Sequence, residues 1–166
     1  MTTPACVLVI AFAVAVAAGC ETAGRAPAPD ADADSSAPAP VALDSTGPGG
    51  AVDVIRRYYE AIDTGDYAAA YALWAQDGAA SGQAYEAFAA GFAQTARSGV
   101  EITGPVVMEG AAGSSFAEVP VRVRATTRSG EDQQFEGTYV VRRVNDVPGA
   151  TPAQLRWHIH EARLHQ

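Results

Sequence analysis

The chain has 166 residues, which suits one modest domain, and a formal net charge of −8 at neutral pH. Its basic residues are all arginine and form no basic stripe, so the composition argues against nucleic-acid binding. The only two cysteines, Cys6 and Cys20, lie near the amino end. A disulfide framework and a cysteine-rich zinc site are therefore excluded for the rest of the chain.

Residues 1–19 have the character of an export signal. The apolar run CVLVIAFAVAVAA is shorter than the about 20 residues of a transmembrane helix, and it ends in small residues. The stretch VAAGC resembles the lipobox of bacterial lipoproteins, which implies that Cys20 carries the lipid. The expected location is the bacterial cell envelope on the periplasmic side, and Glu21 favours the outer membrane. The alternative is a soluble secreted protein cut near Ala18.

Residues 20–50 are predicted to form a disordered tether. The segment is rich in Ala, Pro, Asp, Ser and Gly and has almost no bulky apolar side chain. Such a segment buries too little apolar area to offset the entropy of ordering its backbone. The tether separates the membrane anchor from a domain predicted over residues 51–166.

A first helix is predicted over about residues 51–63. Its apolar residues recur at spacings of three and four, which is the pattern of one buried helix face: Val52, Ile55, Tyr59 and Ile62. The sequence TGD then predicts a turn, with Gly65 in the left-handed conformation and Asp66 as the N-cap of a second helix. That second helix carries Tyr71 and Trp74.

A third helix is predicted to begin at a Ser81 N-cap and to run to about Arg97, because Tyr85, Phe88 and Phe92 recur at helical spacing. After Gly99 the apolar period falls to two, which is typical of strands. Four strands are predicted, in the stretches VEITGPVVMEG, FAEVPVRVRAT, QFEGTYVVRRV and QLRWHIHEARL. The predicted fold is α+β, with three N-terminal helices packed on a curved four-stranded antiparallel sheet.

The stretches IRRYYEAIDTGDYAAAYALW and YEAFAAGF resemble the nuclear-transport-factor-2-like superfamily, also called cystatin-like. The resemblance implies a cone in which a curled sheet surrounds a long helix. Members include ketosteroid isomerase, polyketide cyclases, limonene epoxide hydrolase, scytalone dehydratase and many noncatalytic exported domains. It therefore indicates the fold more clearly than the function.

Tyrosines and tryptophans are the candidate binding residues, because small-molecule sites are mostly apolar with a few polar groups. The set expected at the mouth of the cone is Tyr59, Tyr71, Trp74, Tyr85 and Trp157. The alternative is that these side chains fill the core, which a domain of about 115 residues also needs.

Glu161 is the one candidate for a catalytic acid. An uninterrupted last strand would send Glu161 inward, in phase with Trp157 and Ile159, whereas a one-residue bulge would turn it outward and bury Ala162 and Leu164 instead. The bulge is favoured because it buries two apolar residues in place of one carboxylate. No catalytic residue is therefore assigned.

His158 and His160 lie two residues apart on a strand, so they could share a metal ion, but no third ligand stands at a recognisable spacing. No metal and no cofactor are predicted. The outward strand positions also carry Arg122, Arg124 and Arg142. These arginines predict either cross-strand pairing with Glu118 and Glu136 or, with the two histidines, a surface for a homodimer or protein partner.

The function expected from the sequence is that of a membrane-tethered lipoprotein whose cone domain binds a ligand or partner without catalysis. One alternative is an isomerase, dehydratase or cyclase that acts on a small molecule in the same cone. Another is a structural component of the cell envelope.

Overall fold

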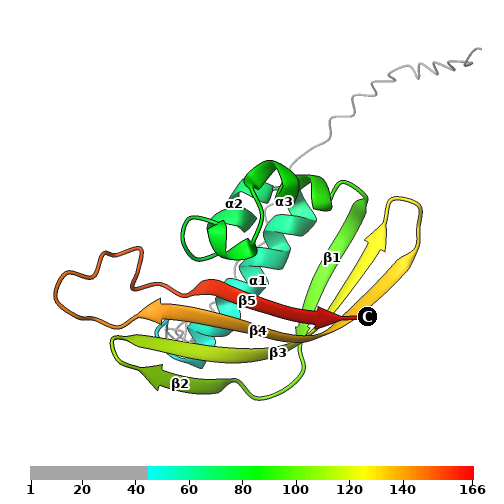
Figure 1. Cartoon of the computed structure of the whole chain (residues 1–166). Helices are drawn as coiled ribbons and strands as arrows, with labels where there is room; N and C mark the ends of the chain where they lie inside the picture. Colours follow the sequence, from blue (N-terminus) through cyan, green and yellow to red (C-terminus); the bar gives the residue numbers. More distant parts are fainter. Residues whose placement is uncertain (1–44) are drawn as a thin grey trace, which may run out of the picture. The chain divides into compact units, whose positions relative to one another are not determined.

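The structure is a computed structural model that describes residues 45–166. The predicted signal, Cys20 and most of the predicted tether lie outside the described residues. Helices come first and strands follow (Figure 1). The elements are α1 (Pro48–Thr64), α2 (Tyr67–Ala72), the 3₁₀ helix η1 (Ala79–Ser81), α3 (Tyr85–Gly91), β1 (Thr95–Ile102), β2 (Val107–Ala111), β3 (Ser114–Thr127), β4 (Asp132–Val144) and β5 (His158–His165).

The predicted turn between the first two helices is confirmed. Gly65 caps α1 with φ of 76°, a left-handed conformation that glycine adopts without steric cost. Asp66 caps α2, since its Oδ1 accepts a hydrogen bond from the backbone N–H of Ala69 at 3.0 Å. α1 itself begins at Pro48, three residues earlier than predicted.

The prediction for the third helix was wrong at both ends. Ser81 belongs to η1, which Gly82 ends with φ of 75°, and α3 begins after Ala84 with no side-chain cap. The helix ends at Gly91, because Phe92 stacks on Tyr67 and the chain then turns into β1. Residues 95–97, predicted as helix, are strand.

The sheet is antiparallel, with strand order β1-β3-β4-β5. β1 and β2 both pair with β3, at its carboxyl and amino halves respectively. The α+β class is as predicted, but the described residues form five strands and not four. The first predicted strand is divided between Ile102 and Val107, where Gly104 and Pro105 interrupt it, because proline cannot donate to a strand ladder.

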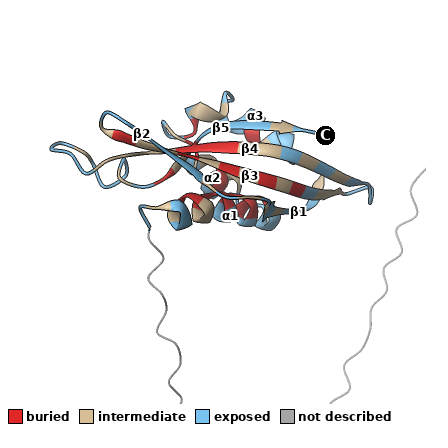
Figure 2. Cartoon of the chain, turned by 90° about the horizontal axis from the view of Figure 1, so that it is seen from below, coloured by how far each residue is buried: buried red, intermediate tan, exposed pale blue. Residues whose placement is uncertain are grey.

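The core lies between α1 and the inner face of the sheet, where the buried stretches of helix and strands face each other (Figure 2). On β3 the predicted alternation is confirmed, since Val119, Val121 and Val123 are at most 4 % exposed. Gly137 of β4 has φ of 153°, and a side chain there would collide with the carbonyl oxygen of Arg163 on β5. Within residues 45–166, no helix has the length and apolar character to cross a membrane.

Candidate functional site

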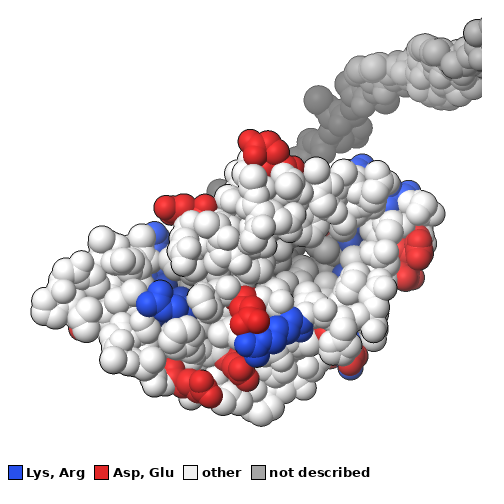
Figure 3. Space-filling model, viewed as in Figure 1, with Lys and Arg blue, Asp and Glu red and all other residues white. Residues whose placement is uncertain are grey.

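A cleft of about 420 Å³ opens between the helices and β5. Figure 3 shows the surface hollowed below α2 and α3, beside the charged pair on β5. The buried side chains that line this cleft are aromatic: Tyr58, Trp74, Phe88 and Tyr139. Its rim is formed by short side chains of η1 and by residues 160–162 of β5. We call this feature the aromatic cleft.

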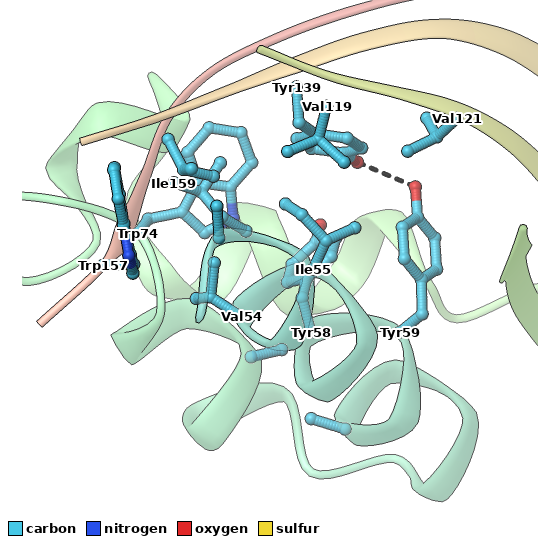
Figure 4. Close-up of a cluster of buried hydrophobic side chains, with 14 of the residues drawn as sticks. Val54, Ile55, Tyr58, Tyr59, Trp74, Val119, Val121, Tyr139, Trp157 and Ile159 are labelled. Carbon is cyan, nitrogen blue, oxygen red and sulfur yellow. Dashed lines mark hydrogen bonds between the residues drawn. The ribbon is translucent and has the colours of Figure 1, made fainter. Parts of the chain in front are cut away.

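Tyr58 is the centre of the aromatic cluster at the cleft (Figure 4). Its ring makes edge contacts with Tyr59, Trp74 and Tyr139 at centroid distances of 5.1, 6.0 and 6.1 Å. Edge-to-face pairs of this kind add about 0.5–1.5 kcal/mol each beyond the area they bury. The cluster therefore holds its rings in fixed orientations, and it joins α1, the end of α2 and β4.

The polar groups of this cluster are hydroxyls and an indole. Tyr59 and Tyr139 share a hydrogen bond of 2.7 Å between their hydroxyl oxygens, and both residues are buried. Burial raises the pKa of Tyr58, Tyr59 and Tyr139 above the usual range, so all three phenols stay neutral at physiological pH. The Nε1 of Trp74 is buried and makes no hydrogen bond of standard geometry among residues 45–166, although its interaction with the Tyr58 hydroxyl lowers the pKa of that phenol against the larger effect of burial. The cleft therefore presents neutral groups, and its phenols do not act as bases.

Of the five aromatic residues expected at one mouth, four lie in or beside the aromatic cleft, since Tyr71 contacts the cleft residue Phe88 at a centroid distance of 5.2 Å, and Trp157 lies apart. Tyr59 and Trp74 belong to the cluster at the aromatic cleft, where they are also core residues. Tyr71 contacts Tyr85 at a centroid distance of 5.6 Å and donates its hydroxyl to the Gln83 carbonyl oxygen. Trp157 is buried at another place, beneath Arg143.

Tyr58 was missed by the sequence analysis. It lies next to the predicted stripe of α1 and is only 4 % exposed. The buried arc of α1 is wider than one stripe and also includes Val54. Trp74 and Phe88, which come from the segments after α1, cover Tyr58 in addition to the sheet. The spacing of three from Ile55 to Tyr58 was a signal that fitted this wider arc.

Glu161 lies on the rim of the aromatic cleft and not on its buried floor. The pairing of β5 with β4 slips by one residue at His160, which is the predicted bulge, and Glu161 then faces Val140 on the outer side. Its carboxylate accepts two hydrogen bonds from Arg163, at 2.8 and 2.7 Å. These bonds lower the pKa of Glu161. Ala162 and Leu164 take the inward positions, although only Leu164 is partly buried.

The two candidate metal-binding histidines have different surroundings. Nδ1 of His158 lies 3.0 Å from the carbonyl oxygen of Arg156, and the ring of His160 packs edge-on against Phe116. No cluster of three or more histidine, cysteine, aspartate or glutamate side chains suited to a metal ion occurs in residues 45–166.

The outward arginines of β3 are paired across the sheet. Arg122 donates to Glu136 on β4 at 2.8 Å and to Glu101 on β1 at 3.4 Å, and Arg124 lies 3.7 Å from Glu101. The cross-strand pairing that the sequence predicted is therefore present with Glu136, whereas Glu118 pairs with Arg163. Arg142 differs, because it donates to Ser114 Oγ and lies over the ring of Phe116.

Comparison with models of known protein families and with curated proteins gives no match. Two solved structures are similar in fold. One is a nuclear transport factor 2 (NTF2-like) superfamily protein from Salmonella enterica serovar Typhimurium, 15 % identical, with a TM-score of 0.47 over 68 % of this chain and 85 % of that one. The other is a protein of unknown function from Mycobacterium tuberculosis, 18 % identical, with a TM-score of 0.48 over 69 % and 68 %. The described domain has the α+β arrangement of helices on a curved sheet that the sequence resemblance implied.

Proposed function

We propose that this chain is an exported lipoprotein, anchored to the bacterial cell envelope through Cys20, whose domain binds a small apolar ligand in the aromatic cleft without chemical turnover. The observation that carries the proposal is the composition of the cleft floor. It consists of aromatic rings with neutral polar edges, and among residues 45–166 no carboxylate or histidine is buried there.

The chemistry of the cleft favours a ligand with a flat apolar body and few polar groups. Aromatic walls gain most from flat apolar ligands. The polar edges of the rings are engaged within the cluster, since the Trp74 indole interacts with the Tyr58 hydroxyl and the hydroxyls of Tyr59 and Tyr139 are bonded to each other. The cleft therefore offers mainly apolar contact area to a ligand.

Fluorescence of the neutral apolar probe N-phenyl-1-naphthylamine tests binding in the cleft. Ala162 lies on the rim, so Ala162→Phe narrows the entrance without altering a buried residue. The matched control is Ala68→Phe, at an exposed position of α2 that does not line the cleft. We expect saturable binding that Ala162→Phe weakens at least about tenfold, with Ala68→Phe unchanged. Equal binding by the two variants would exclude the cleft as the site.

The anchor is tested separately by Cys20→Ala. The proposal expects the unaltered chain to incorporate radiolabelled fatty acid and to sediment with membranes, and expects Cys20→Ala to lose both properties. If the substituted chain is still labelled, the lipid is not on Cys20. If neither chain is labelled, the alternative of a soluble secreted protein replaces the lipoprotein.

The alternative of an isomerase, dehydratase or cyclase requires an acid or base inside the cleft. The titratable side chains that line it, apart from the tyrosines, are His160 and Glu161 on the rim, and Glu161 is held by Arg163. A partner surface on the outer sheet face is a further candidate, favoured by half-buried Phe116 between Arg142 and His160. The ion pairs of Arg122 and Arg124 neutralise much of that face.

A further inference from the structure

A second cavity of about 430 Å³ lies where β4 ends and the loop after it leads to β5. It is separate from the aromatic cleft, with which it shares no lining residue. Arg142 and Arg143 line it from β4, His158 lines it from β5, and Gln76 and Asp77 lie on the opposite wall. Figure 3 shows basic side chains gathered beside the protruding loop at the left of the view. We call this cavity the arginine notch.

The arginines of the notch differ from the other arginines of the sheet in having no carboxylate partner. Arg122, Arg124 and Arg163 each lie within 3.7 Å of a glutamate oxygen. Among residues 45–166, neither Arg142 nor Arg143 has an ion pair. Two arginines against the one carboxylate that lines the notch, that of Asp77, leave a local excess of positive charge.

Arg143 is held in place while its hydrogen-bonding capacity is unused. Its guanidinium lies over the ring of Trp157, with the Cζ atom 5.6 Å from the ring centroid. Within the described residues, Nε of Arg143 and Nε1 of Trp157 are both buried and both lack a hydrogen-bond partner. Buried donors without partners are rare, and here Nε of Arg143 has no internal acceptor that would compete with a ligand for this guanidinium. The stacking also orders the guanidinium before any ligand arrives.

We propose that the arginine notch binds the phosphate group of a small phosphate ester. The guanidinium group presents paired N–H donors that match phosphate oxygens, and it is more weakly hydrated than an ammonium group. Arg143 lines the notch from the Trp157 side of β4, and Arg142 lines it from the Phe116 side, where one Nη atom donates to Ser114 Oγ and the other N–H groups remain for a ligand. The carboxylate of Asp77 lines the same notch. It accepts hydrogen bonds from the hydroxyl groups of a ligand, whereas it repels an anion such as inorganic phosphate that brings no such hydroxyl groups. The preferred ligand is therefore an ester with free hydroxyl groups, such as glycerol 1-phosphate.

Isothermal titration calorimetry of the full chain in a non-ionic detergent tests this proposal, with chloride holding the ionic strength constant. We expect saturable binding of glycerol 1-phosphate, and weaker binding of inorganic phosphate. Arg142→Gln and Arg143→Gln should each weaken binding at least about tenfold. The matched control is Arg56→Gln, which removes the same charge at an exposed position of α1 outside the notch and should change binding less than about twofold.

Two results would overturn the proposal: no saturable binding of glycerol 1-phosphate, or equal weakening by Arg56→Gln and Arg142→Gln, which would indicate a diffuse charge effect. Arg143 packs on the core residue Trp157, so circular dichroism must show that Arg143→Gln is folded. Arg142 is half-exposed, so Arg142→Gln still tests the notch if Arg143→Gln unfolds. Phosphatidylglycerol added to the micelles identifies the source of the ester. If phosphatidylglycerol competes with glycerol 1-phosphate for binding, the natural ligand is a lipid headgroup. If it does not compete, the natural ligand is a free phosphate ester.

Discussion

Removal of one hydroxyl from the buried tyrosine pair should cost more than removal of both. In Tyr139→Phe the hydroxyl of Tyr59 stays buried and loses its partner at 2.7 Å, and Tyr59→Phe does the same to Tyr139. Tyr59 is 7 % exposed and Tyr139 is 2 % exposed, so water does not readily replace the lost partner. An unsatisfied buried hydroxyl costs about 1–3 kcal/mol, whereas replacing both partners by apolar groups is nearly neutral.

Urea unfolding of the two single variants and the double variant measures this difference as a double-mutant cycle. We expect each single variant to lose about 1–2 kcal/mol and the double variant to lose about 1 kcal/mol or less, which gives a coupling free energy of at least about 1 kcal/mol. The reasoning would be refuted by additive losses, because additivity means that neither hydroxyl depends on the other. Val121→Ala, an unrelated core truncation, serves as the additive control when combined with Tyr139→Phe.

Three further predictions concern stability. Burial raises the pKa values of Tyr58, Tyr59 and Tyr139, so the folded state keeps protons that the unfolded chain releases above about pH 10. The free energy of unfolding is therefore unaffected below that pH. Above it, the free energy of unfolding should fall by up to about 1.4 kcal/mol per pH unit for each tyrosine. Alkaline unfolding followed by ultraviolet absorbance checks this, and ionisation of these three of the six tyrosines before unfolding would contradict it. Gly137→Ala should destabilise by about 1–3 kcal/mol, since the new methyl group meets the Arg163 backbone, whereas Gly110→Ala on β2, with open space around it, should be neutral or stabilising in the same denaturation assay. Asp66→Ala should cost about 1 kcal/mol by removing the cap of α2, and Asp66→Asn, which keeps an acceptor oxygen, should lose much less; equal thermal stability of the two variants would argue against the cap.

The features that the sequence predicted correctly depend on neighbouring residues. The turn at Gly65 and Asp66 follows from the local chemistry of helix ends, and the faces of β3 follow from strict alternation. The bulge at His160 followed from comparing which side chains each phase would bury. These are the cases in which local preference and burial agree.

The features that the sequence did not predict depend on contacts between distant segments. The predicted carboxyl end of α3 was wrong because Phe92 leaves the helix and stacks on Tyr67. The predicted aromatic set does not form one site, because Trp157 lies apart from the aromatic cleft under Arg143. The spacing of aromatic residues along a helix or strand does not tell which of them meet in the folded domain. Arg142 and Arg143 alternate like any strand pair, and only the loop that folds back toward Gln76 brings both into one cavity.

β5 has a consequence for the order in which the domain assembles. Its Ile159 lies opposite Val141 in the sheet, while its backbone N–H donates to the Leu73 carbonyl oxygen and its carbonyl oxygen accepts from the Ala75 N–H, both at 2.8 Å. Trp157 and Ile159 are also core residues. A ribosome delivers this strand after all the described segments that it joins. The nascent domain therefore cannot close its core before β5 has emerged, and its folding should then occur in one cooperative step.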